Sequence, residues 1–425
     1  MIEKIFNQFL KCRSVTTDTR AMSQGAIFFA LKGDNFNGNT FAQQALDAGC
    51  SLVVVDEEQE INDDRLILVE DSLKALQQLS GLYRDTFQFP VIAITGSNGK
   101  TTTKELMMAV LERKFRVHAT KGNLNNHIGV PLTLLATPKD TEIAIIEMGA
   151  NHQREIASYC EYAKPDFGLI TNIGKAHLEG FGGEEGVKKG KRELYDYIHA
   201  RGGKVFVNVE LDKLNEVSEG MERVEYGFET GKFQLNVVGE TPFLSFEIAM
   251  SEGQFVVHSK LSGVYNLYNF ASAIAVGQYF GVTMPEQIVA MESYNPDNNR
   301  SQIVKTSKNT LIMDAYNANP TSMEHALRNL SKQTGKQFFV IGDMRELGDS
   351  AEVEHRNIIS LVKELGLIGI TVGEEFEKVN TLENIRSFKN NDEARPYLEG
   401  LTLESNIILI KGSRGIRLEQ LKDIF

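Results

Sequence analysis

The amino-acid sequence predicts an α/β fold built on parallel sheets. Short apolar runs, such as residues 91–95 and 142–149, alternate with helical segments along most of the chain. Strands of this kind are typical of sheets that helices cover on both faces. Between about residues 232 and 260 the pattern changes to alternating apolar and polar residues, which favours an antiparallel annex. A length of 425 residues agrees with about two to four domains.

We expect three domains. Residues 1–88 mix strand-like runs with helices and predict a small N-terminal α/β domain. Residues 89–297 carry the repeated strand, loop and helix pattern together with the annex, and predict a central parallel-sheet domain. Residues 294–301 are polar and rich in turn formers, so the last domain is expected to cover 298–425. Its alternating strands and helices predict a Rossmann-like α/β fold.

Composition and charge exclude several classes of protein. The chain has 45 basic and 57 acidic residues, a net charge of −12, which argues against a generic binder of nucleic acid or of an anionic membrane. Its three cysteines are far apart, so we expect neither a disulfide framework nor a cysteine-based zinc site. Residues 1–12 lack the apolar core of a secretory leader. No apolar run reaches the ~18–20 residues that span a bilayer, and we expect a cytoplasmic protein.

The strongest local feature is the sequence ITGSNGKTTTKE at residues 94–105, between an apolar run and a helical segment. Backbone N–H groups of a glycine-rich turn and the N-terminus of the following helix together bind phosphate. Lys100 would reach the β- and γ-phosphates of a nucleotide, and the Thr101 hydroxyl would hold Mg²⁺. Ile94 stands where the general P-loop pattern has glycine, so this loop is a shorter variant; a glycine-rich turn with an exposed lysine is the alternative. The expected ATP-binding residues of the turn are Gly96, Ser97, Asn98, Gly99, Lys100, Thr101 and Thr102.

Three further charged or titratable residues accompany the central sheet. Glu147 ends an apolar run and could complete the coordination of Mg²⁺, which prefers oxygen ligands, or could cap a helix. His177 follows another apolar run, where a surface hydrogen-bonding histidine is the alternative. Lys188, Lys189 and Lys191 lie on an expected helix, whose ordinary interpretation is a solvated basic face. Only one of these lysines could project into a crevice, and helical phase leaves open which one.

Asparagines and later charged residues supply weaker candidates. Asn123, Asn125 and Asn126 lie close together and could orient a polar substrate or form turns that shape a loop. Asp314, Asp343 and Lys411 each follow an apolar run, where a ligand crevice of a parallel sheet would lie. Taken alone, none of these residues identifies a site.

A series of motifs runs in order along nearly the whole chain. By this series the sequence resembles the Mur ligase family of ATP-dependent amide-bond-forming enzymes, and an ordered series is much more specific than any one motif. GNLNNHIGVPLTLL is especially typical of members that add D-alanyl-D-alanine to UDP-N-acetylmuramoyl-tripeptide. The motifs are TTDTR, GAIFFALKG and FNGNTF in the first domain, ITGSNGKTTTKE, GNLNNHIGVPLTLL, IEMGAN, NIGKAHLEGFG and GKRELY in the second, and DAYNANPTSM, GDMRELG and KGSRG in the third.

The resemblance implies a reaction in cytoplasmic peptidoglycan precursor synthesis. The terminal carboxylate of UDP-N-acetylmuramoyl-tripeptide would attack the γ-phosphate of ATP, and the amine of D-alanyl-D-alanine would displace phosphate from the resulting acyl phosphate. Both steps develop charge on oxygen, so positioned cations should supply most of the acceleration. The first domain would bind the UDP-sugar, the central P-loop domain ATP, and the last domain the dipeptide. We expect a monomer.

The resemblance also implies a set of site residues. In this family a lysine in the position of Lys191 is often carbamylated, which converts a cation into a carboxylate that binds a second Mg²⁺. That reaction needs a neutral amine, hence a lysine with a lowered pKa. The implied catalytic residues are Lys100, Glu147, His177 and Lys191, and the implied ligands of two Mg²⁺ ions are Thr101, Glu147, His177 and Lys191. The implied adenine, ribose or phosphate contacts are Asn266, Arg300, Asp314 and Asn317, and the implied substrate contacts are Thr19, Arg20, Asn39, Asn123, Asn125 and Asn126.

Three positions depart from the family pattern. Tyr265 stands where the family usually has the histidine that precedes the adenine-side asparagine, so a stacking partner has changed. Asn39 replaces the usual histidine of the N-terminal domain, which weakens the expected contact to uracil or diphosphate. Arg154 replaces a common glycine and receives no role.

Two alternatives stay open at this point. The first is a related ligase, either a folylpolyglutamate synthase or a Mur enzyme that adds a different amino acid. The N-terminal segment argues against the folate enzyme, which lacks a UDP-sugar domain. The second is a P-loop protein that binds nucleotide as a regulatory switch, which would need the P-loop residues but neither His177 nor Lys191.

Overall fold

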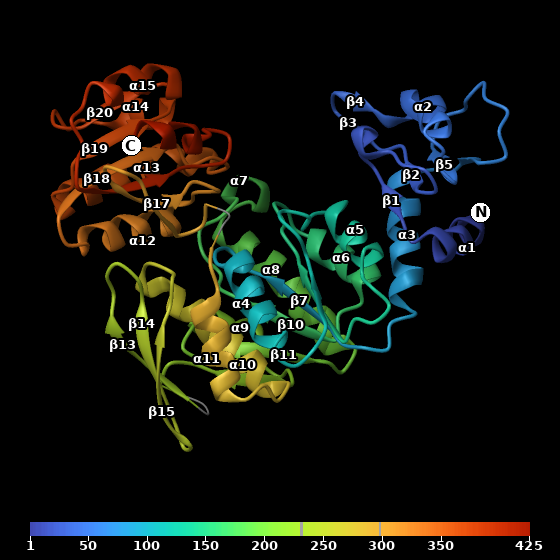
Figure 1. The fold of residues 1–425 in the computed structure, drawn as a ribbon, viewed down its shortest axis with the longest axis horizontal. Helices are drawn as coiled ribbons and strands as arrows, with labels where there is room; N and C mark the ends of the chain where they lie inside the picture. Colours follow the sequence, from blue (N-terminus) through green and yellow to red (C-terminus); the bar gives the residue numbers. More distant parts are fainter. Residues whose placement is uncertain (230–232, 297–298) are drawn as a thin grey trace.

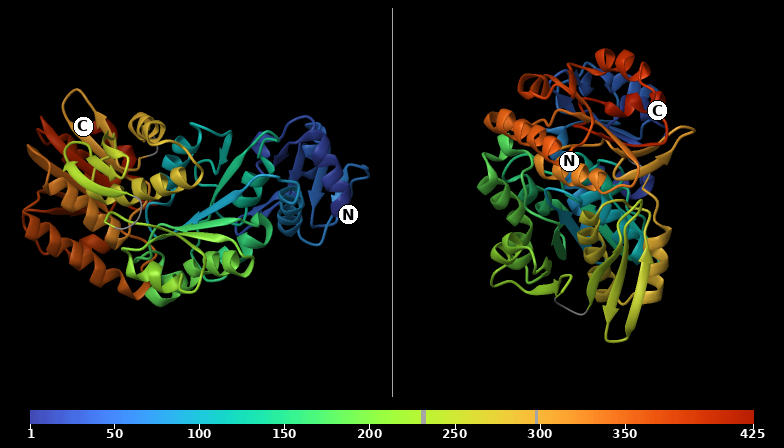
Figure 2. Two further views of the ribbon diagram at one scale, coloured as in Figure 1. Left: turned by 90° about the horizontal axis from the view of Figure 1, so that it is seen from below. Right: turned by 90° about the vertical axis from the view of Figure 1, so that its left-hand side faces the viewer.

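The computed structural model describes residues 1–229, 233–296 and 299–425. Three sheet-based parts follow one another along the long axis of the molecule, with the N-terminal part at one end and the C-terminal part at the other (Figure 1). The central part lies between them and contacts both (Figure 2). The three-domain α/β architecture predicted from the sequence is confirmed.

The N-terminal part is built on a parallel sheet with helices on both faces. Alternate side chains of one strand serve different cores, as the two-residue period of a strand requires: Ile27 and Phe29 join one core and Phe28 the other. The strand order is β1 (Val15–Thr16), β2 (Ile27–Phe29), β5 (Leu52–Val55) and β6 (Leu66–Leu68). The first core takes α1 (Ile2–Cys12) and α3 (Ser72–Arg84), the second takes α2 (Ala42–Asp47), and β3 (Lys32–Gly33) pairs with β4 (Phe36–Asn37) outside the sheet.

The central part contains the larger parallel sheet. Its strand order is β12 (Arg223–Tyr226), β11 (Lys204–Asn208), β10 (Phe167–Ile170), β7 (Val91–Thr95), β9 (Ile143–Glu147) and β8 (Val117–Ala119). Strands β7 and β9 are buried along their whole length, which explains their unbroken apolar sequences. Because β7, β9 and β10 are parallel, the segments that follow them meet at one edge of the sheet.

Helices cover both faces of the central sheet. One face packs against α4 (Lys100–Leu111), α10 (Leu267–Tyr279) and α11 (Met284–Ser293). The other face packs against α5 (Gly129–Leu135), α6 (Glu155–Ala163), α8 (Glu184–Ala200) and α9 (Asp212–Val217), with α7 (Leu178–Phe181) beside α8.

The predicted antiparallel annex is present beside this sheet. It consists of β13 (Gln234–Gly239), β14 (Ser245–Met250) and β15 (Gly253–His258). Phe246 and Ile248 alternate with less buried residues and face the central core, where the Phe246 ring lies 4.9 Å from that of Phe270 on α10. One covered face and one open face explain the alternating sequence.

The C-terminal part is a second α/β unit. Its sheet has the order β16 (Gln302–Lys305), β17 (Thr310–Asp314), β21 (Asn406–Lys411), β18 (Lys336–Gly342), β19 (Gly369–Val372) and β20 (Arg386–Phe388). Strand β16 pairs antiparallel with β17, because the short turn between them cannot hold a crossover helix; the other pairings are parallel. The helices are α12 (Pro320–Ser331), α13 (Ala351–Leu365), α14 (Glu374–Val379) and α15 (Asn391–Glu399).

Helix α3 joins the N-terminal part firmly to the central part. It packs against α5 and α6, and it ends at Arg84, whose guanidinium is buried. Arg84 Nε donates to Ala163 O at 3.0 Å, and Nη2 donates to Lys164 O and to Asp166 Oδ2, both at 2.8 Å. Burial lowers the pKa of Arg84 while the charge of Asp166 opposes this. One helix therefore packs against elements on both sides of the junction.

We expect Arg84→Met to destabilise this junction by roughly 1–3 kcal/mol, because buried carbonyl oxygens lose their donors. The measurement is the first transition in thermal or urea unfolding. Arg356→Met, which changes an exposed arginine on α13, is the control and should stay within about 0.5 kcal/mol of the parent chain. Equal stability of the two variants would contradict the role given to Arg84.

The exact domain limits stay predictions. The proposed limit at 88/89 falls between α3 and β7, and the limit at 297/298 lies outside the described residues. Across residues 1–229, 233–296 and 299–425, the helices are all too short or too polar to cross a membrane.

Candidate active site

The glycine-rich turn between β7 and α4 has the backbone that the sequence requires. Gly96 has φ +145°, and a Cβ there would lie 1.9 Å from Thr171 Oγ1. Gly99 precedes the helix with φ +79°. Glycine is therefore needed at both positions. The turn is held from the neighbouring strand, since Asn98 N donates to Asn172 Oδ1 at 3.0 Å.

Lys100 turns back over this loop. Its Nζ donates to Gly96 O at 2.7 Å, and desolvation lowers the pKa of Lys100 to about 8, partly offset by the charge of Glu147. Arg300 lowers the same pKa. An anion placed in the turn would favour the charged form of this lysine.

Glu147 lies beside the P-loop with half of its carboxylate engaged. Its Oε1 accepts from Thr101 Oγ1 at 3.0 Å and from Asn125 Nδ2 at 2.8 Å. Its Oε2 is buried and, within the described residues, accepts no hydrogen bond; the nearest cation is Lys104 Nζ at 3.9 Å. A buried carboxylate oxygen without a donor, next to a threonine hydroxyl, fits a hard divalent cation.

Lys191 is the lysine of its helix that points inward. It is 1% exposed, whereas Lys188 reaches Glu216 and Lys189 is exposed. Its Nζ has no hydrogen-bond partner among the residues that the structure describes, and it lies 5.1 Å from the Phe181 ring centroid. Burial holds the pKa of Lys191 well below its ordinary value, and the charge of Lys100 lowers it further. Burial therefore disfavours the charged form of this amine.

His177 connects the central and C-terminal parts. It lies between β10 and α7 with φ +52°, and its Nδ1 contacts Glu346 of the C-terminal part. This hydrogen bond lowers the pKa of Glu346. His177 thus stands at the boundary of the two parts rather than on an open surface.

A cavity of about 430 Å³ lies between these two parts and gathers most of the predicted site. Two predicted residues lie behind the lining residues. Thr101 donates a hydrogen bond to Glu147, and Lys191 lies near Lys100. The predicted residues that line it are Ser97, Asn98, Gly99, Lys100, Thr102, Asn123, Asn125, Asn126, Glu147, His177, Asn266, Arg300, Asp314 and Asn317.

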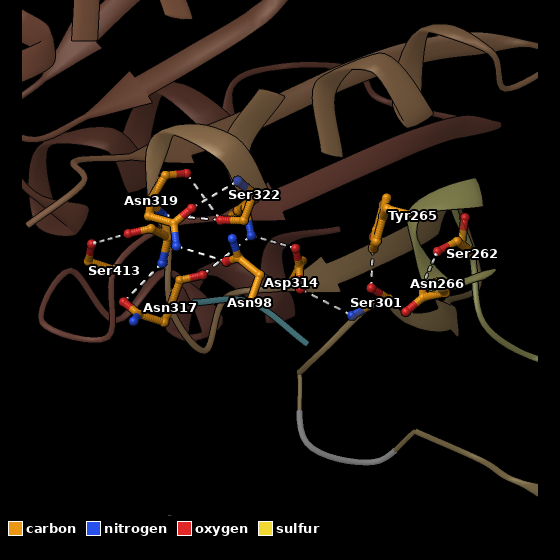
Figure 3. A network of polar contacts seen from close by, with 12 residues as sticks. Asn98, Ser262, Tyr265, Asn266, Ser301, Asp314, Asn317, Asn319, Ser322 and Ser413 are labelled. Carbon is orange, nitrogen blue, oxygen red and sulfur yellow. Dashed lines mark hydrogen bonds and ion pairs between the residues drawn. The ribbon is translucent and has the colours of Figure 1, made fainter. Parts of the chain in front are cut away.

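Polar contacts connect the two walls of the cavity (Figure 3). Asn319 caps α12 and donates from Nδ2 to Asn98 Oδ1 of the P-loop at 2.8 Å. Tyr265 lies within 2.8 Å of Ser301 through their hydroxyls, and Ser301 N donates to Asp314 Oδ1 at 3.2 Å. The C-terminal part therefore contacts the P-loop directly.

Three predicted substrate residues lie elsewhere, in the N-terminal part. Thr19 and Arg20 form a short 3₁₀ turn, where Arg20 pairs with Asp18 and is largely exposed. Asn39 is buried and donates to Asp56 Oδ1 at 2.8 Å. Their roles stay predictions.

Several cavity residues were not predicted from the sequence. Tyr316 carries the Arg300 guanidinium 3.7 Å from its ring centroid and the Arg414 guanidinium at 5.6 Å. His325 was also not predicted. Its ring is stacked with that of Tyr265, with centroids 5.6 Å apart, and Tyr265 is the residue that stands in place of the family's usual histidine. The YNANP sequence after β17 carried the information for Tyr316 and Asn319, since residues that follow a parallel strand face the crevice.

The fold and the cavity define a nucleotide-binding enzyme of the P-loop type whose site is shared by two α/β domains. Three family models match the chain. They are the Mur ligase family catalytic domain at residues 11–117, the Mur ligase middle domain at 94–277 and the Mur ligase glutamate ligase domain at 299–414. The chain belongs to the Mur ligase family.

Two similar proteins carry the same name. UDP-N-acetylmuramoyl-tripeptide–D-alanyl-D-alanine ligase of Bacillus subtilis is 35% identical over 96% of this chain and 92% of its own length. The enzyme of the same name from Escherichia coli is 32% identical over 96% of this chain and 92% of its own length.

Solved structures agree with these relatives. MurF from Acinetobacter baumannii has a TM-score of 0.88 at 32% identity and covers 97% of this chain and 93% of its own. MurF ligase from Thermotoga maritima, solved in complex with ADP, has a TM-score of 0.88 at 27% identity and covers 98% and 97%.

Proposed function

We propose that the chain is an ATP-dependent ligase that joins D-alanyl-D-alanine to UDP-N-acetylmuramoyl-tripeptide in peptidoglycan precursor synthesis, with release of ADP and phosphate. The names of relatives that align over nearly their whole length support this activity. The observation that carries it is local: a P-loop lysine and a half-satisfied buried carboxylate line one cavity between two domains, and a buried lysine lies beside Lys100.

The side chains of this cavity suit phosphoryl transfer to a carboxylate. The backbone N–H groups of residues 96–100 and the start of α4 would hold the phosphates, with Lys100 turning from Gly96 O toward them. Arg300 would add a second cation from the C-terminal part. Charge that develops on the transferring group would be stabilised by donors already in place, which is the largest source of acceleration in such reactions. Closure by the C-terminal part would exclude water from a hydrolysable acyl phosphate.

The donor set fits Mg²⁺ beside the P-loop. Thr101 and Glu147 would hold one ion, because the free Oε2 of Glu147 and the Thr101 hydroxyl are both oxygen ligands. Within the described residues, side chains of His, Cys, Asp and Glu do not gather in threes. Phosphate oxygens of ATP would supply further ligands. Such an ion supplies positive charge to the phosphate oxygens during transfer.

Lys191 would complete the place for a second Mg²⁺ near His177. A neutral amine can add to carbon dioxide to give a carbamate, and the buried, unpaired Nζ of Lys191 supports this modification. The product is a carboxylate with oxygen ligands, set close to the cationic Lys100. The modification would thus place an anion beside the Lys100 cation and form an opposite-charge pair.

The remaining assignments follow the arrangement of the domains. We assign the UDP-sugar to residues 1–88, with Thr19, Arg20 and Asn39 as its nearest contacts, ATP to 89–297 and the dipeptide to 298–425. Asn123, Asn125 and Asn126 line the cavity and would contact the donor peptide. Asn266 would lie near adenine, and Asp314 and Asn317 near ribose or phosphate. A cytoplasmic monomer is the expected form.

A substrate panel tests the proposed function. UDP-N-acetylmuramoyl-tripeptide and ATP are incubated with D-alanyl-D-alanine or with single amino acids, and the products are weighed by mass spectrometry. We expect phosphate release and a pentapeptide product only with the dipeptide. Phosphate release only with a single amino acid would assign the chain to a different ligase, and nucleotide binding without any ligation would favour a switch.

A further inference from the structure

Helix α4 carries a second buried lysine, which the proposed function does not use. Lys104 lies one turn after Lys100 on the same side of the helix. It is 2% exposed, and its Nζ donates to Thr120 O at 2.6 Å. A lysine is almost never fully buried unless it is paired. The place of this cation therefore needs a reason beyond the packing of α4.

Within the described residues, two carboxylates lie near the Lys104 ammonium, and one of them is the carboxylate assigned to Mg²⁺. Lys104 Nζ lies 3.9 Å from Glu147 Oε2 and 3.8 Å from Glu105 Oε1. Both distances are too long for a hydrogen bond, so the ammonium adds positive charge without occupying an oxygen of Glu147. A fixed cation thus compensates part of a buried negative charge and leaves Oε2 open to a metal ion.

Thr120 connects Lys104 to the backbone of Glu147. Thr120 follows β8 and is 2% exposed. Its carbonyl accepts from Lys104, and its Oγ1 accepts from Glu147 N at 2.9 Å. Thr120 N donates to Ile145 O at 3.0 Å, which fixes Thr120 against β9. Lys104 therefore bonds to the residue that holds the end of β9, and Glu147 is the last residue of that strand.

The same contacts extend to the loop at residues 121–128, which follows Thr120. Asn125 of this loop donates from Nδ2 to Glu147 Oε1 at 2.8 Å. The loop also lines the main cavity through its asparagines. It is therefore attached at its start to Lys104, through Thr120, and in its middle to the carboxylate of Glu147.

We propose that Lys104 is a positioning residue of the ligation, whose ammonium holds Glu147 and the loop at residues 121–128 in one arrangement before Mg²⁺ and the donor peptide bind. This inference rests on the magnesium site of the proposed function and adds the residue that prepares it. Lys104 is not one of the cavity-lining residues, so it acts through Glu147 and Thr120. Groups that orient a metal ligand in this way typically contribute about tenfold to a hundredfold to metal affinity.

The experiment measures ADP binding to the full chain by calorimetry, with and without Mg²⁺, in the absence of both ligation substrates. For Lys104→Met we expect the gain in ADP affinity that Mg²⁺ provides to fall by about tenfold to a hundredfold, while ADP affinity without Mg²⁺ stays within about threefold of the parent chain. Methionine keeps an unbranched apolar stem and removes the ammonium. Arg113→Met, at an exposed arginine just beyond the end of α4, is the matched control and should bind like the parent chain.

Thr120→Val reaches Glu147 from its backbone and provides a second variant. Valine is close to threonine in shape but leaves Glu147 N without its acceptor, whereas the carbonyl that accepts from Lys104 remains. The gain from Mg²⁺ should fall in this variant as well. Circular dichroism checks the folding of both variants, and Thr120→Val carries the test if Lys104→Met does not fold.

Steady-state ligation at saturating Mg²⁺ tests the role of the loop. In Lys104→Met, KM for the nucleotide-linked peptide should rise by about threefold to tenfold, which corresponds to the loss of one hydrogen bond. KM for D-alanyl-D-alanine should stay that of the parent chain. An unchanged KM for the nucleotide-linked peptide would overturn the part of the proposal that concerns the loop.

The dependence on Mg²⁺ decides the part that concerns Glu147. An unchanged gain from Mg²⁺ in the folded variant would overturn it. An equal loss of ADP affinity with and without Mg²⁺ would also overturn it, because a lysine that only supports the fold would have that effect. A parent chain that gains nothing from Mg²⁺ would overturn the magnesium site itself, whereas failure of the substrate panel alone would overturn the proposed ligation and not the role of Lys104 in ADP binding.

Discussion

Replacing Lys191 by alanine should lower the rate of ligation by about a thousandfold or more while leaving ATP affinity within about threefold. The reason is the position of Lys191, which lies near Lys100 but is not one of the residues that line the cavity. The variant should fold normally, because it removes a buried amine whose Nζ has no hydrogen-bond partner in the described part of the chain. Rate is measured by phosphate release and affinity by calorimetry with a non-hydrolysable ATP analogue.

Lys189→Ala is the matched control for this variant, since Lys189 lies on the same helix and is exposed. It should keep full activity. A short-chain carboxylic acid should restore part of the activity of Lys191→Ala by taking the place of a carbamate, and Lys191→Arg should not respond to it in the same way. Normal turnover by Lys191→Ala would remove this lysine from the mechanism.

The Glu147→Gln variant should show the second largest loss, about a hundredfold to a thousandfold in kcat/KM, together with a tenfold to hundredfold higher Mg²⁺ requirement. Glutamine keeps the size of the side chain and an oxygen that can accept from Thr101 and Asn125. It removes the negative charge and puts an amide NH₂ group, which does not coordinate a cation, in the place of the free carboxylate oxygen. The test is a Mg²⁺ titration of phosphate release at saturating ATP.

Glu161→Gln provides the comparison, because Glu161 is an exposed residue of α6. Its Mg²⁺ dependence should equal that of the parent chain. If Glu147→Gln kept the parent Mg²⁺ dependence and rate, Thr101 and Glu147 could not be the place of the ion.

The P-loop is the part of the site that could be predicted most completely from the sequence. Gly96 and Gly99 both have positive φ angles, a local requirement of the turn that glycine satisfies without strain. Glu147 could be placed because β9 is buried along its length and parallel to β7, which puts the end of one strand beside the start of the other's loop. The alternating annex sequence likewise follows from one covered face.

Long-range contacts account for what the sequence could not provide. Helical phase did not distinguish Lys191 from Lys188, since the choice depends on which face of α8 meets Phe181 and the sheet. The contact between Asn98 and Asn319 joins residues of different domains, and no local pattern encodes it. The same holds for Arg414 and Tyr316, whose stacking arises only when the loops after β17 and β21 come together. The antiparallel pairing of β16 was also hidden, because a short edge strand has little periodicity of its own.

The contacts of α3 with both the N-terminal and the central part have a consequence for the donor substrate. Because Arg84 anchors this helix to the central part and its other face fills the N-terminal core, α3 ties the sheet assigned to the UDP-sugar to the part that carries Lys100. Under the proposed function, a donor held by its nucleotide in the N-terminal part needs a peptide long enough to bring its carboxyl to Lys100. Each extended residue adds ~3.3–3.6 Å, so a peptide one unit shorter leaves its carboxyl out of reach. Length itself, and not a contact to every residue of the peptide, becomes a criterion of selection.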